Sequence, residues 1–219
     1  MKKLLSLLLI APLFFISSCE EEGPIHGCLD SQACNYNPEA TLDNNSCEYA
    51  IEGFDCDGNS SQVLEIGALM NGGIVFYIDE TGEHGLVAAI EDLEGTYEWG
   101  CYASELTGAD GTSIGTGYQN TLDIVAGCSE TPTAASEALA YESEGYSDWY
   151  LPSKEELVEM YNTIGNGGPQ GNIGGFSSFW YWSSSEFSNS NAWGVNFPVG
   201  NTFNRNKSNT YRVRVIRAF

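Results

Sequence analysis

Apolar runs bounded by turn-forming residues predict strands near both ends of the main domain. Gly73 to Ile78 and Leu86 to Ile90 are two such runs, and the intervening residues 79–85 are rich in turn formers. This arrangement predicts a β-hairpin. In the C-terminal third, further apolar and aromatic runs predict strands at Phe179–Ser183, Ala192–Phe197 and Tyr211–Arg217.

Apolar positions three and four residues apart predict a helix over residues 153–164. Ser153 and Glu156 have the spacing of a capping box, and Leu157, Met160, Tyr161 and Ile164 would lie on one face. Glu155, Glu156 and Glu159 lie off this face and are expected to be solvated.

Proline and glycine mark the boundaries of a second helix. It is expected to begin near Thr131-Pro132 and to end at Gly145. The glycine-rich residues 165–175 predict a loop. Helices segregated from antiparallel hairpins indicate the α+β class.

Residues 1–18 have the features of a targeting segment. Lys2 and Lys3 precede an apolar run that is shorter than the roughly 20 residues of a membrane-spanning helix. The following Ser17-Ser18-Cys19 resembles the end of a bacterial lipobox, which implies cleavage before Cys19 and lipid attachment to its sulfur. An ordinary signal peptide followed by a chance cysteine is the alternative.

Residues 19–27 are expected to form an acidic tether. Glu20, Glu21 and Glu22 resemble the tract that sends some lipoproteins of Gram-negative bacteria to the outer face of the outer membrane. A solvated charge run is the alternative. We therefore expect a lipid-anchored, surface-exposed protein of the outer membrane.

Charge excludes one class of partner. From Cys19 onward, six basic residues stand against 30 acidic ones, a net charge of −24. A broad nucleic-acid-binding surface needs clustered Lys and Arg, so we expect no nucleic-acid partner.

Four cysteines lie close together in residues 28–62, which predicts a small disulfide-rich module. Its sequence resembles a cysteine-bounded repeat of exported bacterial proteins (GCxDxxACNYNPxAxxDxxSC). Of the three possible pairings, Cys28–Cys47 with Cys34–Cys56 is preferred.

The same module contains a candidate calcium loop. Asp55, Asp57 and Asn59 alternate around Gly58, as the early ligands of such loops do, but position 66 is Ile where an EF-hand has its bidentate Glu. We therefore expect no cofactor other than calcium bound in this module. The alternative is that these residues form turns.

Several ordered motifs resemble the Lcl C-terminal domain family over residues 63–219. The motifs are Gly72–Tyr77, Ile114–Thr121, Asp148–Leu157, Tyr181–Glu186, Ala192-Trp193 and Tyr211–Arg217. The resemblance implies a C-type-lectin-like fold with antiparallel strands and two or three helices, similar also to formylglycine-generating enzymes. The family's namesake caps a bacterial adhesin that binds sulfated glycosaminoglycans, which implies a surface-binding role.

The sequence offers little support for catalysis. His26 and His84 are expected to be solvated, and the serine-nucleophile, zinc and phosphate-loop motifs are absent. Formylglycine-generating relatives act through cysteines, but Cys101 and Cys128 are expected to form a third structural disulfide. We expect no enzymatic activity. An enzyme on the formylglycine-generating scaffold and a structural envelope protein that binds another protein are the alternatives.

Two groups of residues are candidates for binding a polysaccharide, and anionic polysaccharides are among the ligands expected. The first is basic, and Arg212 and Arg214 would share one face of the last strand. The second combines aromatic rings with amides that can contact sugars. The candidates are Arg205, Lys207, Arg212, Arg214, Trp180, Tyr181, Asn189 and Asn191. The alternative is that the cations pair with carboxylates, and Trp182, Trp193, Val195 and Phe197 are expected in the core.

Overall fold

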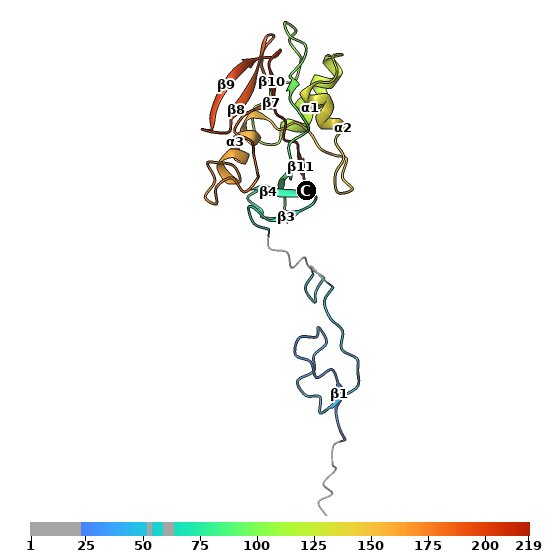
Figure 1. Cartoon of the computed structure of the whole chain (residues 1–219). Coiled ribbons are helices and arrows are strands. Elements are labelled where there is room, and N and C mark those ends of the chain that lie inside the picture. Colours follow the sequence, from blue (N-terminus) through green and yellow to red (C-terminus); the bar gives the residue numbers. More distant parts are fainter. Residues whose placement is uncertain (1–22, 52–53, 59–63) are drawn as a thin grey trace, which may run out of the picture. The chain divides into compact units, whose positions relative to one another are not determined.

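The structure, a computed structural model, describes residues 23–51, 54–58 and 64–219. The chain divides into two compact units, residues 1–63 and 64–219 (Figure 1), each described by itself below. The predictions for the signal peptide, for Cys19 and for Asn59 lie outside the described residues.

Disulfides hold the small unit together. Its strands are two residues long, β1 (His26–Gly27) and β2 (Leu42–Asp43), and they pair in parallel. The bonds are Cys28–Cys47 and Cys34–Cys56, as preferred from the sequence. Of the hydrophobic residues described here, Cys28 and Ala33 are buried. So small a core cannot offset the entropy of ordering the chain, so the cross-links supply the stability.

The larger unit contains three helices and three antiparallel sheets among the described residues. The helices are α1 (Gly117–Gly127), α2 (Ala134–Ala140) and α3 (Lys154–Thr163). The strands are β3 (Leu69–Met70), β4 (Gly73–Ile78), β5 (Gly85–Ala89), β6 (Tyr97–Glu98), β7 (Trp180–Ser188), β8 (Asn191–Asn196), β9 (Asn201–Asn206), β10 (Thr210–Tyr211) and β11 (Ile216–Ala218). The sheet orders are β11-β5-β4-β3, β7-β8-β9 and β10-β6. The predicted β4–β5 hairpin is confirmed.

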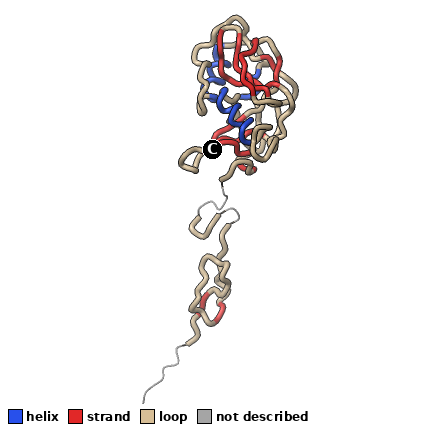
Figure 2. The backbone as a smooth tube through the Cα atoms, turned by 90° about the vertical axis from the view of Figure 1, so that its left-hand side faces the viewer, coloured by secondary structure: helices blue, strands red, loops and turns tan. Residues whose placement is uncertain are grey.

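Helix α3 packs between the two larger sheets. Its Leu157, Met160 and Ile164 share a buried cluster with Phe76 of β4 and Tyr181 of β7. Helices α1 and α2 pack together beside the β7 edge of the β7–β8–β9 sheet, away from its β9 edge (Figures 1 and 2). The core on that side contains Trp99, Trp149 and Trp182. Val195 and Phe197 are also buried, as predicted, whereas Trp193 is half-buried.

The capping box of α3 is confirmed, but the predicted solvation of Glu156 is wrong. The Ser153 side chain accepts from the Glu156 backbone, while Glu156 Oε2 accepts from Ser153 N at 2.6 Å. The Glu156 carboxylate is fully buried, and its Oε1 accepts from Gly115 N at 2.7 Å. It therefore also binds the start of α1, a helix that was not predicted and whose preceding residue, Thr116, makes no side-chain cap.

Two boundaries differ from the prediction. Helix α2 begins after Thr133, which caps it, and ends at Ala140 before reaching Gly145. The predicted strand Tyr211–Arg217 is broken at residues 213–215, where the carbonyl oxygens of Val213 and Val215 accept from Leu93 N and from Ala89 N at the end of β5. No strand runs through this segment, yet Arg212 and Arg214 both reach Asp92, at 3.7 and 2.8 Å, so the two side chains lie on the same side of the chain as predicted.

Candidate ligand-binding surface

The six basic residues beyond Cys19 differ in how far their side chains are buried. Lys207, Arg214 and Arg217 are buried, and Lys154, Arg205 and Arg212 are partly exposed. This separation decides which of them can meet a ligand.

Arg214 is a buried residue whose hydrogen bonds are made within the protein, and its prediction as a ligand-binding residue is wrong. Its Nε and one terminal nitrogen lie 2.8 Å from Asp92 Oδ1. Its other terminal nitrogen donates to the carbonyl oxygens of Ala89 (2.9 Å) and Gly174 (2.8 Å). The side chain is 1% exposed, so its donors are used inside the protein.

Lys207 is also an internal residue, and its prediction as a ligand-binding residue is wrong. Its ammonium forms a buried ion pair with Glu186 and donates to Ser104 O at 2.8 Å. Glu186 in turn accepts from the backbone of Leu106. This pair joins β7 to the loop before α1 and to the turn after β9.

Tyr181 faces the core, which contradicts its predicted place in the ligand site. Side chains alternate across a strand, so Tyr181 points away from the face that carries Trp180. Its hydroxyl donates to Asp92 Oδ2 at 2.7 Å and accepts from Ser177 N at 2.8 Å. Burial, together with the hydrogen bond to Asp92, raises the pKa of Tyr181 well above its ordinary value.

Arg205 and Trp180 meet on the outer face of the β7–β8–β9 sheet. The guanidinium carbon of Arg205 lies 3.9 Å from the centroid of the Trp180 ring, a cation–π contact. Gly194 lies on the strand between them, where a side chain would crowd the β7 backbone more than the ring. A Cβ there would lie 3.7 Å from Trp180 Cε3 and 3.0 Å from Tyr181 O.

Arg205 retains donors for a ligand. Among the described residues it is the cation without an ion pair; its Nε has no hydrogen-bond partner but is buried, so an anion would meet the terminal nitrogens of the guanidinium. By contrast, Arg212 lies 3.7 Å from Asp92 and its side chain is 35% exposed. Arg205 is thus the cation best placed to bind an anion.

Amides and a second ring extend this face. Cross-strand pairing places Asn196 and Asn201 in one row with Trp180, and Phe203 in the next row. Phe203 is 52% exposed and its ring centroid lies 6.1 Å from that of Trp180. We call Trp180, Asn196, Asn201, Phe203 and Arg205 the outer-face cluster. The sequence also pointed to Asn196 beside the aromatic residues, but it gave no indication of Asn201 and Phe203, although the alternation of Phe203 and Arg205 was a usable signal.

Asn189 and Asn191 lie at the other end of the sheet. Asn191 pairs with Asn206, whereas Trp180 pairs with Asn196. Five residues of extended chain span about 16 Å, so the structure does not bring these amides to Trp180. Asn191 instead shares a strand face with Trp193, so these amides lie near the Phe187–Trp193 pair, and ligand binding by them stays a prediction.

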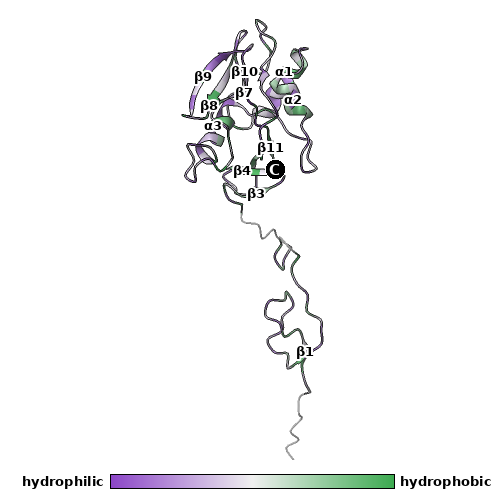
Figure 3. Ribbon diagram, viewed as in Figure 1, coloured by the Kyte–Doolittle hydropathy of each residue, from purple (hydrophilic) through white to green (hydrophobic). Residues whose placement is uncertain are grey.

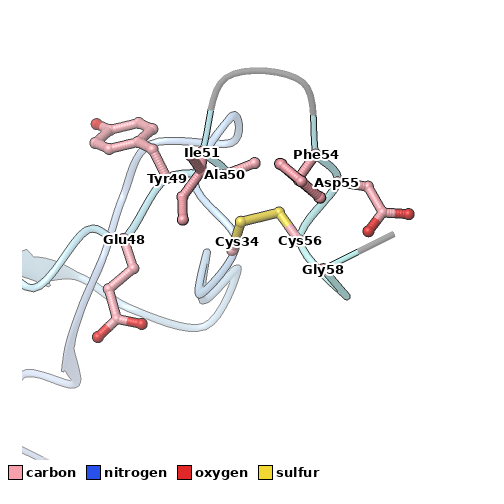
Figure 4. Close-up of a pocket in the computed structure, with 9 residues that line it drawn as sticks. All are labelled: Cys34, Glu48, Tyr49, Ala50, Ile51, Phe54, Asp55, Cys56 and Gly58. Carbon is pink, nitrogen blue, oxygen red and sulfur yellow. A yellow bond between two sulfur atoms is a disulfide. The ribbon is translucent and has the colours of Figure 1, made fainter. Parts of the chain in front are cut away.

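The hollows of the surface lie elsewhere. One of about 440 Å³ in the small unit is lined by apolar side chains around the Cys34–Cys56 bond, among them Tyr49, Ile51 and Phe54 (Figure 4). Another, of about 410 Å³, is lined by acidic groups including Glu91, Glu94, Glu137 and Glu142. The outer-face cluster lies on a sheet face and lines neither of these hollows, which suits an extended chain better than an enclosed small molecule.

The metal candidates remain weak. Within the described ranges, one group of ligand-type side chains is close enough to hold an ion, namely Cys101, Cys128 and Glu130. The two cysteines are disulfide-bonded, as predicted, so they offer no thiolate. Asp55 Oδ1 accepts from Asp57 N at 2.9 Å, a contact typical of a turn. Calcium binding by Asp55 and Asp57 stays a prediction.

Comparison with known proteins identifies the larger unit. Residues 88–217 match the family described as the Lcl C-terminal domain. The chain belongs to this family. The match covers β6 to β10 and the first two residues of β11, including all of the outer-face cluster. Much of the Lcl motif at 148–157 is scaffold, because Trp149, Leu151, Glu156 and Leu157 are buried.

Other comparisons add little to the Lcl domain assignment. A fimbrial protein from Bacteroides ovatus, known from a crystal structure, has 17% sequence identity and a TM-score of 0.44, with 80% of this chain covered. The chain spans about half (51%) of that protein. No curated protein matches the sequence. In the part of the chain that the structure describes, no helix has the length and apolar character needed to cross a membrane.

Proposed function

We propose that this protein is a non-catalytic adhesin whose outer-face cluster binds an acidic polysaccharide. The observation that carries the proposal is the partly exposed Arg205 stacked on Trp180, without an ion pair to any described residue. A guanidinium presents paired N–H groups that match carboxylate and sulfate. The neighbouring rings and the amides of Asn196 and Asn201 supply stacking and hydrogen bonds for sugar rings.

Local charge supports an anionic ligand despite the acidic chain. From Phe187 to Phe219 the sequence contains no Asp or Glu. Charges separated by more than about 8 Å are largely screened at physiological salt. The acidic surface elsewhere therefore acts weakly on an anion at Arg205.

The cellular setting is part of the proposal. A lipid on Cys19 would anchor the protein to the outer membrane, and the acidic tether would support display at the cell surface. The C-type-lectin-like fold that the family resemblance implies agrees with a binding role. The enzyme alternative needs a free Cys101 beside a pocket, and the Cys101–Cys128 disulfide weighs against it.

Binding to heparin, hyaluronate and neutral dextran tests the proposal. We expect the full chain to bind the anionic polymers, and Arg205→Ala to lose that binding. Lys154→Ala is the matched control, because Lys154 also lies over a tryptophan, at 4.9 Å from the Trp193 ring on the other sheet face. Equal binding by the Arg205→Ala variant, or none by the wild type, contradicts the proposal.

A further inference from the structure

Strand β9 forms one edge of the β7–β8–β9 sheet and hydrogen-bonds to β8 alone. Lys207 N donates to Ser190 O, and antiparallel hydrogen-bonded pairs alternate along a ladder. With the observed register, residues 201, 203 and 205 therefore bond to β8. The N–H and C=O groups of Thr202 and Asn204 point outward, where the described residues provide no backbone partner.

The opposite edge of the same sheet is covered. Along β7, Trp182 N donates to Arg212 O and Arg212 N donates to Trp180 O. Ser184 N and Glu186 N donate to carbonyl oxygens of neighbouring loops. The fold thus satisfies the β7 edge and leaves the β9 edge available.

Strand β9 also lacks the usual protection of an edge. Exposed edges are normally blocked by Pro, Lys, inward charges or bulges. Residues 201–206 contain no Pro, Lys, Asp or Glu, and their pairing with β8 runs without a register shift, unlike that of β7 with β8. The one charge, on Arg205, is folded onto Trp180. The strand is hydrophilic, as Figure 3 shows, which keeps an open edge soluble.

We propose that two copies of this chain pair through β9, antiparallel and about a two-fold axis at Phe203. In this register Thr202 of one copy and Asn204 of the other exchange both backbone hydrogen bonds. Phe203 then lies directly opposite Phe203 of the second copy, as a non-hydrogen-bonded pair with Cα atoms about 4.5 Å apart. Two three-stranded sheets become one sheet of six strands.

Side chains and charge favour a second copy as the occupant. Facing phenylalanines stabilise antiparallel pairs, and this pairing would cover the exposed ring of Phe203. Thr202 and Asn204 of opposite copies meet as a polar pair on the other face. Because residues 187–219 contain no Asp or Glu, two acidic chains meet at this edge with little local repulsion. The outer-face clusters of the two copies would lie on one continuous sheet face.

Disulfide trapping tests the register. Every variant is the full chain and also carries Cys19→Ser. The introduced cysteine is then the free thiol that can form the disulfide between two copies. Phe203→Cys places two cysteines opposite each other within the Cα separation that a disulfide allows. Phe187→Cys is the matched control, because Phe187 is 51% exposed against 52% for Phe203. With a mild oxidant, we expect several-fold more covalent dimer from Phe203→Cys.

Thr202→Pro tests the hydrogen bonds. Its N–H points away from β8, so proline leaves the β8–β9 ladder intact and removes an outward donor. We expect sedimentation of the chain with Phe203 intact to show a concentration-dependent dimer, and Thr202→Pro to abolish it. Equal trapping by Phe203→Cys and Phe187→Cys, or a monomer at every concentration, overturns the inference. Neither readout involves a glycan, so the proposed function can fail while this inference holds.

Discussion

The guanidinium of Arg205 lies over the indole of Trp180, 3.9 Å from the ring centroid, across the glycine of the strand between them. The contact holds a long, otherwise mobile side chain on one face of the sheet. Because a stacked guanidinium loses little further entropy on binding, the pair is preorganised for an anion.

Arg214→Ala is expected to damage the fold rather than a binding surface. It leaves Asp92 largely buried with Tyr181 and without its closest cation. Breaking a buried pair in this way costs about 3–5 kcal/mol of unfolding free energy. Urea denaturation measures the loss. A variant as stable as the wild type would contradict the internal role assigned to Arg214.

Lys207→Met is expected to be similarly destabilising. Lys207 is fully buried, so its removal leaves the buried Glu186 carboxylate without a cation. This costs about 3–5 kcal/mol of unfolding free energy. Lys154→Met is the control, because its partner Glu155 is solvent-accessible and such a change alters stability by about 0.5 kcal/mol or less. Equal denaturation midpoints for the two variants would show that the Lys207–Glu186 pair is not buried in solution.

Glu156 should make stability depend on pH. Burial raises the pKa of its carboxyl above the ordinary 4.5, although backbone hydrogen bonds from Ser153 and Gly115 oppose the shift. A raised pKa means that the folded state holds the proton more tightly. The contribution of this proton binding to the stability of the fold is therefore complete below pH 4.5. It is lost as pH rises through the raised pKa of Glu156.

Glu156→Gln removes this titration and isolates it. We expect the variant to be about 1–3 kcal/mol less stable at low pH, because an amide NH₂ faces a backbone donor. The difference in stability between the wild type and the variant should narrow as pH rises, as measured by thermal melts of both proteins. A gap that widens with pH would mean that the pKa of Glu156 is lowered.

Local signals in the sequence predicted local structure well. The capping box of α3 depends on residues three apart, Ser153 and Glu156, and the β4–β5 hairpin on one turn. The second role of Glu156, binding Gly115 of α1, joins residues 41 apart and has no sequence signature. Strand β9 was missed because its three asparagines have low strand propensity, and it is ordered by its register with β8.

The candidate site was predicted in part for the same reason. Arg205 and Trp180 were chosen by residue type, and their contact supports the choice. Arg212 and Arg214 were expected on one strand face, and both side chains reach Asp92 although no strand runs through residues 213–215. The sequence could not show that Arg214 is buried and Arg212 is partly exposed, because the burial of Arg214 depends on the distant residues Ala89 and Gly174.

Titration of heparin into the full chain and into Arg205→Lys tests the central claim most directly. Lysine keeps the charge but loses the planar fork and its stacking on Trp180, so the account predicts about tenfold weaker binding, or 1.4 kcal/mol. Lys154→Arg, which changes the same chemistry on the other sheet face, should bind like the wild type. Equal affinities for the wild type and the Arg205→Lys variant would contradict the claim that this guanidinium recognises the ligand.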